Sequence, residues 1–192
     1  MSSANKPLRP EWEDMQGLIA SAYAHHPYAD YLVLKIDDAA QTRRWLGALL
    51  ADNLVTRALK HKHGHRDFQL NIAFTANALG RLASQADLTA SAQFVEGMTG
   101  REHRSRMLGD TGESDPEGWR WGGPHQVDVL LMLFGRSQHS LAECHEQIQL
   151  DASGMSEVSK VSTGPFEGAK NATRYPCSTS VFASATATCM LP

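Results

Sequence analysis

The sequence predicts an α+β domain: a ferredoxin-like split βαβ sheet with helices on one face and a long insertion. Three observations predict it. Strand and helix patterns follow one another as strand, helix, strand, insertion, strand, helix, strand. The strand segments alternate apolar and polar residues, and polar capping residues precede the helices. With 192 residues and 42% hydrophobic composition, the chain can bury one core.

The first predicted strand covers Tyr31 to Ile36, in which every second residue from Leu32 is apolar. A helix follows over about residues 38–52. Asp38 stands at its N-cap position, and Gln41 is placed to reach back to it as in a capping box. The apolar positions then recur at helical spacing: Trp45, Leu46, Leu49 and Leu50.

The second predicted strand covers Phe68 to Phe74, where apolar residues again occupy every other position. Thr75 is suited to cap the short helix that follows it, in which Leu79 and Leu82 are the apolar positions. This segment therefore repeats the strand and helix order of the first one.

The third predicted strand, Val127 to Phe134, is apolar on both faces, which is typical of a central strand. Ser137 is expected to cap a helix that runs to about residue 150 and buries a stripe of Leu141, Cys144 and Ile148. Met155 to Val161 is a candidate fourth strand. These elements complete the split βαβ pattern.

The insertion between the second and third strands runs from Ala76 to His125. It contains a second helical stretch over about residues 91–108 and a loop rich in Gly, Asp and Trp over residues 109–124. Long insertions in compact domains are more often functional than accidental. We therefore expect contacts with a cofactor, or between copies of the chain in a homo-oligomer, at this insertion.

Composition and charge exclude several function classes. The formal net charge is -3 and the sequence pI is near 6.3, so no basic face for nucleic acid or an anionic membrane is expected. No apolar run is long enough to span a membrane, and the first 15 residues have no signal-peptide pattern. We expect a cytoplasmic protein. The three cysteines lack metal-ligand spacing and predict no disulfide framework.

Three histidines, His61, His63 and His65, lie in a short basic tract. Imidazole is a common ligand for transition metals, but basic neighbours disfavour a cation and Asp67 is the only nearby carboxylate. A solvated loop is the preferred interpretation. No metal site is expected.

A charged stretch in the insertion has two interpretations. Its arginines could bind an anionic group, because guanidinium offers paired donors to carboxylates. A solvated helix face with weak local ion pairs is the preferred alternative. Trp119 and Trp121 are interpreted as anchors of a packed loop. The charged residues are Glu96, Arg101, His103, Arg104, Arg106 and Asp110.

The order of several short segments resembles the N-terminal half of the dye-decolourising (Dyp-type) haem peroxidases over about residues 14–170. No single segment is specific, and the resemblance rests on their order and spacing. The segments are Met15 to Ile19, Tyr31 to Asp38, Leu70 to Thr75, Glu96-Gly97-Met98, Leu108 to Gly112, Trp119 with Gly122-Gly123-Pro124, and Val127 to Phe134.

The resemblance implies two ferredoxin-like halves, with haem held mainly by the second, so this chain corresponds to the first. It divides the chain into an N-terminal extension (1–29), a ferredoxin-like N-terminal domain (30–170) and an irregular tail (171–192) that we expect to be disordered. After Gly164 to Lys170 the family continues into a Gly-x-x-Asp-Gly segment with the distal Asp, followed by a distal Arg and the proximal His. These do not follow here. We expect a truncated chain on which no catalytic or haem-binding residue can be assigned.

By resemblance, the function is haem-dependent oxidation of small organic substrates with hydrogen peroxide, with this chain inactive alone. The alternative is a haem-free α+β module that makes protein contacts, since ferredoxin-like sheets serve many functions. A Soret absorption band after expression with haem distinguishes the two.

Overall fold

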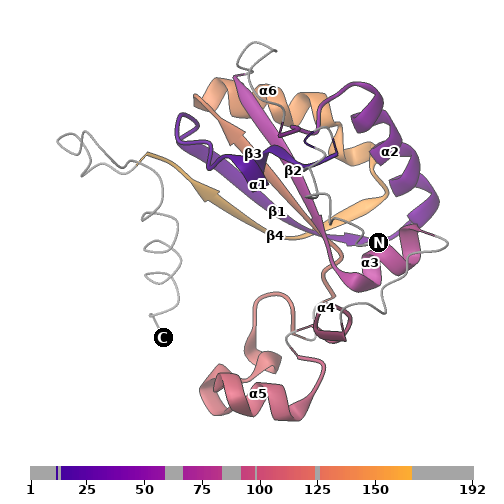
Figure 1. Cartoon of the computed structure of the whole chain (residues 1–192), viewed down its shortest axis with the longest axis vertical. Helices are drawn as coiled ribbons and strands as arrows, with labels where there is room; N and C mark the ends of the chain where they lie inside the picture. The colour runs from indigo at the N-terminus through magenta and orange to yellow at the C-terminus, as the bar shows by residue number, and fades with distance from the viewer. Residues whose placement is uncertain are drawn as a thin grey trace, which may run out of the picture.

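A four-stranded antiparallel sheet organises the computed structural model, which describes residues 12, 14–58, 67–83, 92–97, 99–123 and 126–165. Its strands lie in the order β2-β3-β1-β4 (Figure 1). They are β1 (Tyr28–Ile36), β2 (Phe68–Phe74), β3 (Val129–Gly135) and β4 (Met155–Thr163). The helices are α1 (Gly17–Ala20), α2 (Ala39–Ala51), α3 (Ala76–Leu82), α4 (Ala92–Glu96), α5 (Glu102–Leu108) and α6 (Gln138–Ile148). The α+β, ferredoxin-like prediction is confirmed.

The strand pairing places β3 and β1 in the centre of the sheet, as the apolar pattern of β3 predicts. Across these central strands, Leu32 lies opposite Leu131, which in turn lies opposite Ile72. The pairing of β1 with β4 shifts register between Val33 and Leu34, where β4 has a bulge. Edge strand β4 is longer than predicted because it pairs with β1 as far as Thr163.

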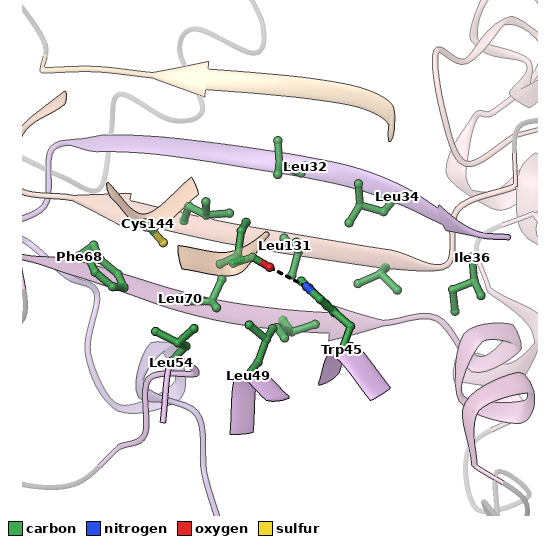
Figure 2. Packing of buried hydrophobic residues seen from close by; sticks show 14 of the residues in the cluster. Leu32, Leu34, Ile36, Trp45, Leu49, Leu54, Phe68, Leu70, Leu131 and Cys144 are labelled. Atoms are coloured by element: carbon green, nitrogen blue, oxygen red, sulfur yellow. Dashed lines mark hydrogen bonds between the residues drawn. The ribbon is translucent and has the colours of Figure 1, made fainter. Parts of the chain in front are cut away.

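Helices α2 and α6 cover one face of the sheet (Figure 1). Figure 2 shows how Trp45 and Leu49 of α2 point toward the leucines of the strands, while Cys144 enters the same core from α6. The indole N–H of Trp45 donates a hydrogen bond of 2.6 Å to the carbonyl of Ile148, joining the two helices. Full burial of such leucines contributes roughly 1.5–3 kcal/mol each.

The three predicted helix caps are present. Asp38 accepts from the backbone N–H of Ala40 and Gln41, Thr75 accepts from Ala78, and Ser137 accepts from Ser140. The expected capping box at α2 is wrong, because the side chain of Gln41 does not reach back to Asp38. The side chain of Gln41 donates to the carbonyl of Ala152, and the backbone N–H of Asp38 donates to Gly154. Tertiary contacts with the turn before β4 replace the local contact.

The helical stretch expected over 91–108 is wrong as a single helix, since the chain forms α4 and α5 instead. Gly97 adopts a left-handed backbone with φ of 64°, which ends α4. Two short 3-10 turns, Gly112–Ser114 and Pro116–Gly118, follow α5. In Figure 1, α5 stands apart from the helix-covered sheet.

The face of the sheet opposite α2 and α6, which we call the second face, contacts the segment that precedes β1. The side chain of Gln16 bonds both the N–H and the carbonyl of Ile72, each at 2.8 Å, as a neighbouring strand would. Tyr23 packs on Phe134 with ring centroids 5.1 Å apart. Gln16 and Tyr23 therefore attach the segment before β1 to the sheet, and β1 begins at Tyr28. The division into an extension, a domain and a tail stays a prediction.

Two expectations fall outside the described part of the chain. These are the solvated loop with His61, His63 and His65, and the irregular tail after residue 170.

Candidate functional site

Asp30, a carboxylate in β1, brings three elements together. Its side chain lies on the helix-covered face of β1, in the same alternation as Leu32, and is 6% exposed. The Nε2 atom of His145, in α6, lies 2.6 Å from Oδ2 of Asp30. From β4, the Nζ atom of Lys160 lies 2.8 Å from the same oxygen, and the Ser162 hydroxyl donates to Oδ1 at 2.6 Å. We call these four residues the Asp30 cluster.

The electrostatics of the Asp30 cluster favour the ionised carboxylate. Burial alone would raise the pKa of Asp30, but hydrogen bonds from Lys160, Ser162 and His145 outweigh that effect and hold the pKa below its usual value. Because Ser162 bonds the carboxylate and not the imidazole, the cluster does not form the serine–histidine–aspartate relay of a hydrolase. Its geometry serves to hold β1, α6 and β4 together.

A second buried carboxylate, Asp128, lies where the two ends of the insertion meet the sheet. Its side chain is fully buried and accepts from the backbone N–H of Ile36 at 2.8 Å. Asn77 and Arg81, near the start of the insertion, donate to it at 2.9 and 3.1 Å. Gln126, just before β3, donates at 3.3 Å. Through these hydrogen bonds, Asp128 therefore holds both ends of the insertion on the sheet.

On the second face of the sheet, an aromatic group lies among buried polar side chains. Tyr31 and Tyr23 both contact Phe134, and the ring of His26 lies 5.9 Å from that of Tyr23. Burial is the largest effect on the phenol of Tyr23 and raises its pKa to about 12. The phenol of Tyr23 stays protonated at neutral pH.

The charged stretch of the insertion forms local ion pairs. The side chain of Glu96 pairs with both Arg101 and Arg104, so one carboxylate of the same segment binds both guanidinium groups. His103 and Arg106 are exposed and Asp110 is half-buried. The interpretation as a charged helix face fits this arrangement better than an anion clamp does.

The two tryptophans of the following loop differ. The indole N–H of Trp119 donates to the carbonyl of Ser114 at 3.0 Å, which supports the interpretation as a loop anchor. The side chain of Trp121 is 46% exposed, so its expected anchoring role is wrong.

The described residues do not fit a haem site. Haem iron needs an axial imidazole, thiolate or phenolate that faces a space for the macrocycle. Of the described histidines, His26 and His145 are the two that are not exposed, and the latter is held by Asp30. An open cavity of about 320 Å³ is lined without any imidazole, thiol or phenol, by Asp52, Leu54, Asp67, Phe68, Glu143 and Gln147. No group of three possible metal ligands occurs within the described ranges.

Solved structures that share this fold include dye-decolourising peroxidases. An ancestral D-type enzyme aligns at a TM-score of 0.64 with 20% identity, over 83% of this chain and 36% of its own. The enzyme from the fungus Auricularia auricula-judae aligns at 0.63 with 18% identity, over 82% and 34%. DyP2 from Amycolatopsis sp. ATCC 39116 aligns at 0.62 with 19% identity, over 81% and 33%. No sequence-family model matches the chain, and no curated protein matches it.

The chain forms an α+β domain of ferredoxin-like architecture. More specifically, it has the fold of one part of a dye-decolourising peroxidase, and it spans about a third of the length of the solved structures that it matches.

No helix among the described residues is long and apolar enough to cross a membrane. The expected cytoplasmic location stays a prediction.

Neither buried carboxylate was predicted as a site residue. A signal for Asp30 was present, because the alternation that places Leu32, Leu34 and Ile36 on the core face places Asp30 there too. A charged residue at a core position implies a partner. The partners of Asp30 lie 115 to 132 residues later in the chain, and no local pattern identifies them.

Proposed function

We propose that the chain supplies one ferredoxin-like half of a dye-decolourising peroxidase. In the complete enzyme, haem oxidises small organic substrates with hydrogen peroxide. Haem supplies the redox chemistry, and the protein supplies binding and electrostatics. This half contributes the sheet and its helical cover.

The single observation that carries the proposal is the extent of the structural match. More than four-fifths of this chain aligns with a peroxidase solved in complex with 2,6-dimethoxyphenol, but it accounts for 35% of that protein. A match that is nearly complete on one side and partial on the other fits one domain of a larger enzyme.

We further propose that the 192-residue chain alone is inactive. The described residues offer no fitting haem ligand, and the resemblance places the distal Asp, distal Arg and proximal His beyond the matching segment. Nothing favours the alternative of a haem-free interaction module.

The coding DNA downstream of the Lys170 codon, translated in all three frames, tests the proposal. We expect one frame to encode a Gly-x-x-Asp-Gly segment, followed by an arginine and a histidine in an otherwise foldable sequence. Absence of such a segment from every frame would count against a peroxidase half.

A joined protein supplies the control for activity. Fusing that frame to residues 1–170 should produce peroxide-dependent oxidation of 2,6-dimethoxyphenol, whereas the 192-residue chain mixed with haemin should not exceed haemin alone. Turnover by the 192-residue chain above haemin would contradict its proposed inactivity.

A further inference from the structure

Edge strand β4 is attached to the sheet unevenly along its length. Its first residue, Met155, is half-buried and packs against the main core, whereas the later residues are all half-buried or exposed, and Val161 is 40% exposed. The bulge between these parts interrupts the ladder with β1. Residues 159–163, which we call the outer half of β4, therefore have little apolar burial to hold them.

The Asp30 cluster lies at this outer half. Ser162 is the register partner of Asp30, and Lys160 pairs with Leu32. Both side chains meet the carboxylate from the strand side, while His145 meets it from α6. Among the described residues, this one nearly buried carboxylate receives each hydrogen bond and ion pair that the structure gives the side chains of Lys160 and Ser162.

We propose that the contacts of Asp30 hold the outer half of β4 on the sheet. When the carboxylate is neutralised, this half-strand separates from β1 as a local unit. The inference does not rest on the proposed function. Helix α6 stays in place in the separated form, because Cys144 and Ile148 remain in the core and Trp45 still donates to the Ile148 carbonyl.

Because of the groups around Asp30, its negative charge determines whether the outer half of β4 stays attached to the sheet. His145 bonds it from α6, Lys160 and Ser162 bond it from β4, and the apolar Leu133 is its register partner on β3. The Cys144 thiol of α6 is near enough for the charge of Asp30 to raise its pKa. No second carboxylate is hydrogen-bonded to Lys160, His145 or Ser162 in the described structure. Neutralising Asp30 removes the negative charge that these donors share and replaces one of its two acceptor oxygens with a donor group.

Native-state hydrogen exchange of the full chain tests the inference. In the wild type at pH 7, the amides of residues 159–163 that pair with β1 should exchange faster than those of β3 and depend weakly on urea, as expected of a local opening. Asp30→Asn should speed their exchange by roughly 10- to 100-fold, the range for a lost hydrogen bond to a charged group, with the weak urea dependence retained.

The control variant is Asp38→Asn, which removes the charge of the exposed N-cap of α2 and should leave the exchange of residues 159–163 unchanged. If Asp30→Asn does not fold, Ser162→Ala removes one donor and should show a smaller change in the same direction. The inference would be overturned if the amides of residues 159–163 exchanged at the same rate as those of β3 and with the same urea dependence. So would unchanged exchange in both Asp30→Asn and Ser162→Ala.

Discussion

The indole N–H of Trp45 donates to the backbone carbonyl of Ile148 at 2.6 Å, linking α2 to the last residue of α6 across 103 residues of sequence. Both side chains belong to the main core, and the carbonyl is one of the four that a helix leaves without an internal partner. The contact therefore satisfies a helix end and packs the two covering helices together (Figure 2).

We expect Trp45→Phe to destabilise the fold, because it leaves the Ile148 carbonyl buried without a donor. The expected loss is about 1–3 kcal/mol from that carbonyl, with a further loss from reduced packing. Urea denaturation followed by circular dichroism measures it. The exposed Leu50→Ala in the same helix is the control and should cost much less. Equal losses for the two variants would contradict the role of the hydrogen bond.

Asp128→Asn should loosen the base of the insertion. Removing one partner of a buried ion pair costs about 3–5 kcal/mol, and we expect about 3 because Arg81 is 34% exposed. Chemical denaturation gives the value, with the exposed Asp37→Asn as a matched control. A loss no larger than that of the control would show that the contacts of Asp128 with Asn77, Arg81 and Gln126 contribute little.

The carboxyl group of Asp30 should titrate below the usual aspartate pKa of about 3.9. A lowered pKa in the folded state means that the contribution of Asp30 to stability is present above about pH 4 and is lost as the pH falls through the folded value. Carbon-13 NMR of the carboxyl group measures the midpoint. Lys160→Met should move it upward, because it removes the first of the hydrogen bonds that lower the pKa. A midpoint at or above 3.9 in the wild type would be inconsistent with the observed contacts.

Cys144 should be inert toward thiol reagents in the folded chain. Burial, with a smaller contribution from Glu143 and Asp30, raises the pKa of its thiol to about 12, so the reactive thiolate is scarce at neutral pH. In a Cys177→Ser, Cys189→Ser background, labelling by a disulfide reagent at pH 8 should require denaturant. Rapid labelling without denaturant would mean that α6 opens readily from the sheet.

Much of the fold is predictable because its signals are local. Alternation over Phe68 to Phe74 gives the exact bounds of β2, and the caps Asp38, Thr75 and Ser137 mark where three helices begin. The break between α4 and α5 is the local feature that was missed. Gly97 was its signal, since glycine tolerates the left-handed backbone that ends a helix.

The polar clusters were not predictable because their partners are distant in sequence. Asp30 meets His145, Lys160 and Ser162 only after β4 has paired beside β1, and the pattern of β4 itself is weak. The contact of Gln41 was not predictable for the same reason. A local capping box was available to it, but the turn before β4 offered the carbonyl of Ala152 instead.

Haem titration of two purified proteins, followed at the Soret band, tests whether this chain is half of a dye-decolourising peroxidase. One is the 192-residue chain, and the other is residues 1–170 joined to the second half encoded downstream. We expect no stoichiometric Soret shift for the first and saturable one-to-one binding for the second. A folded joined protein that binds no haem would contradict the assignment as half of a dye-decolourising peroxidase, and stoichiometric binding by the 192-residue chain would contradict its dependence on the second half.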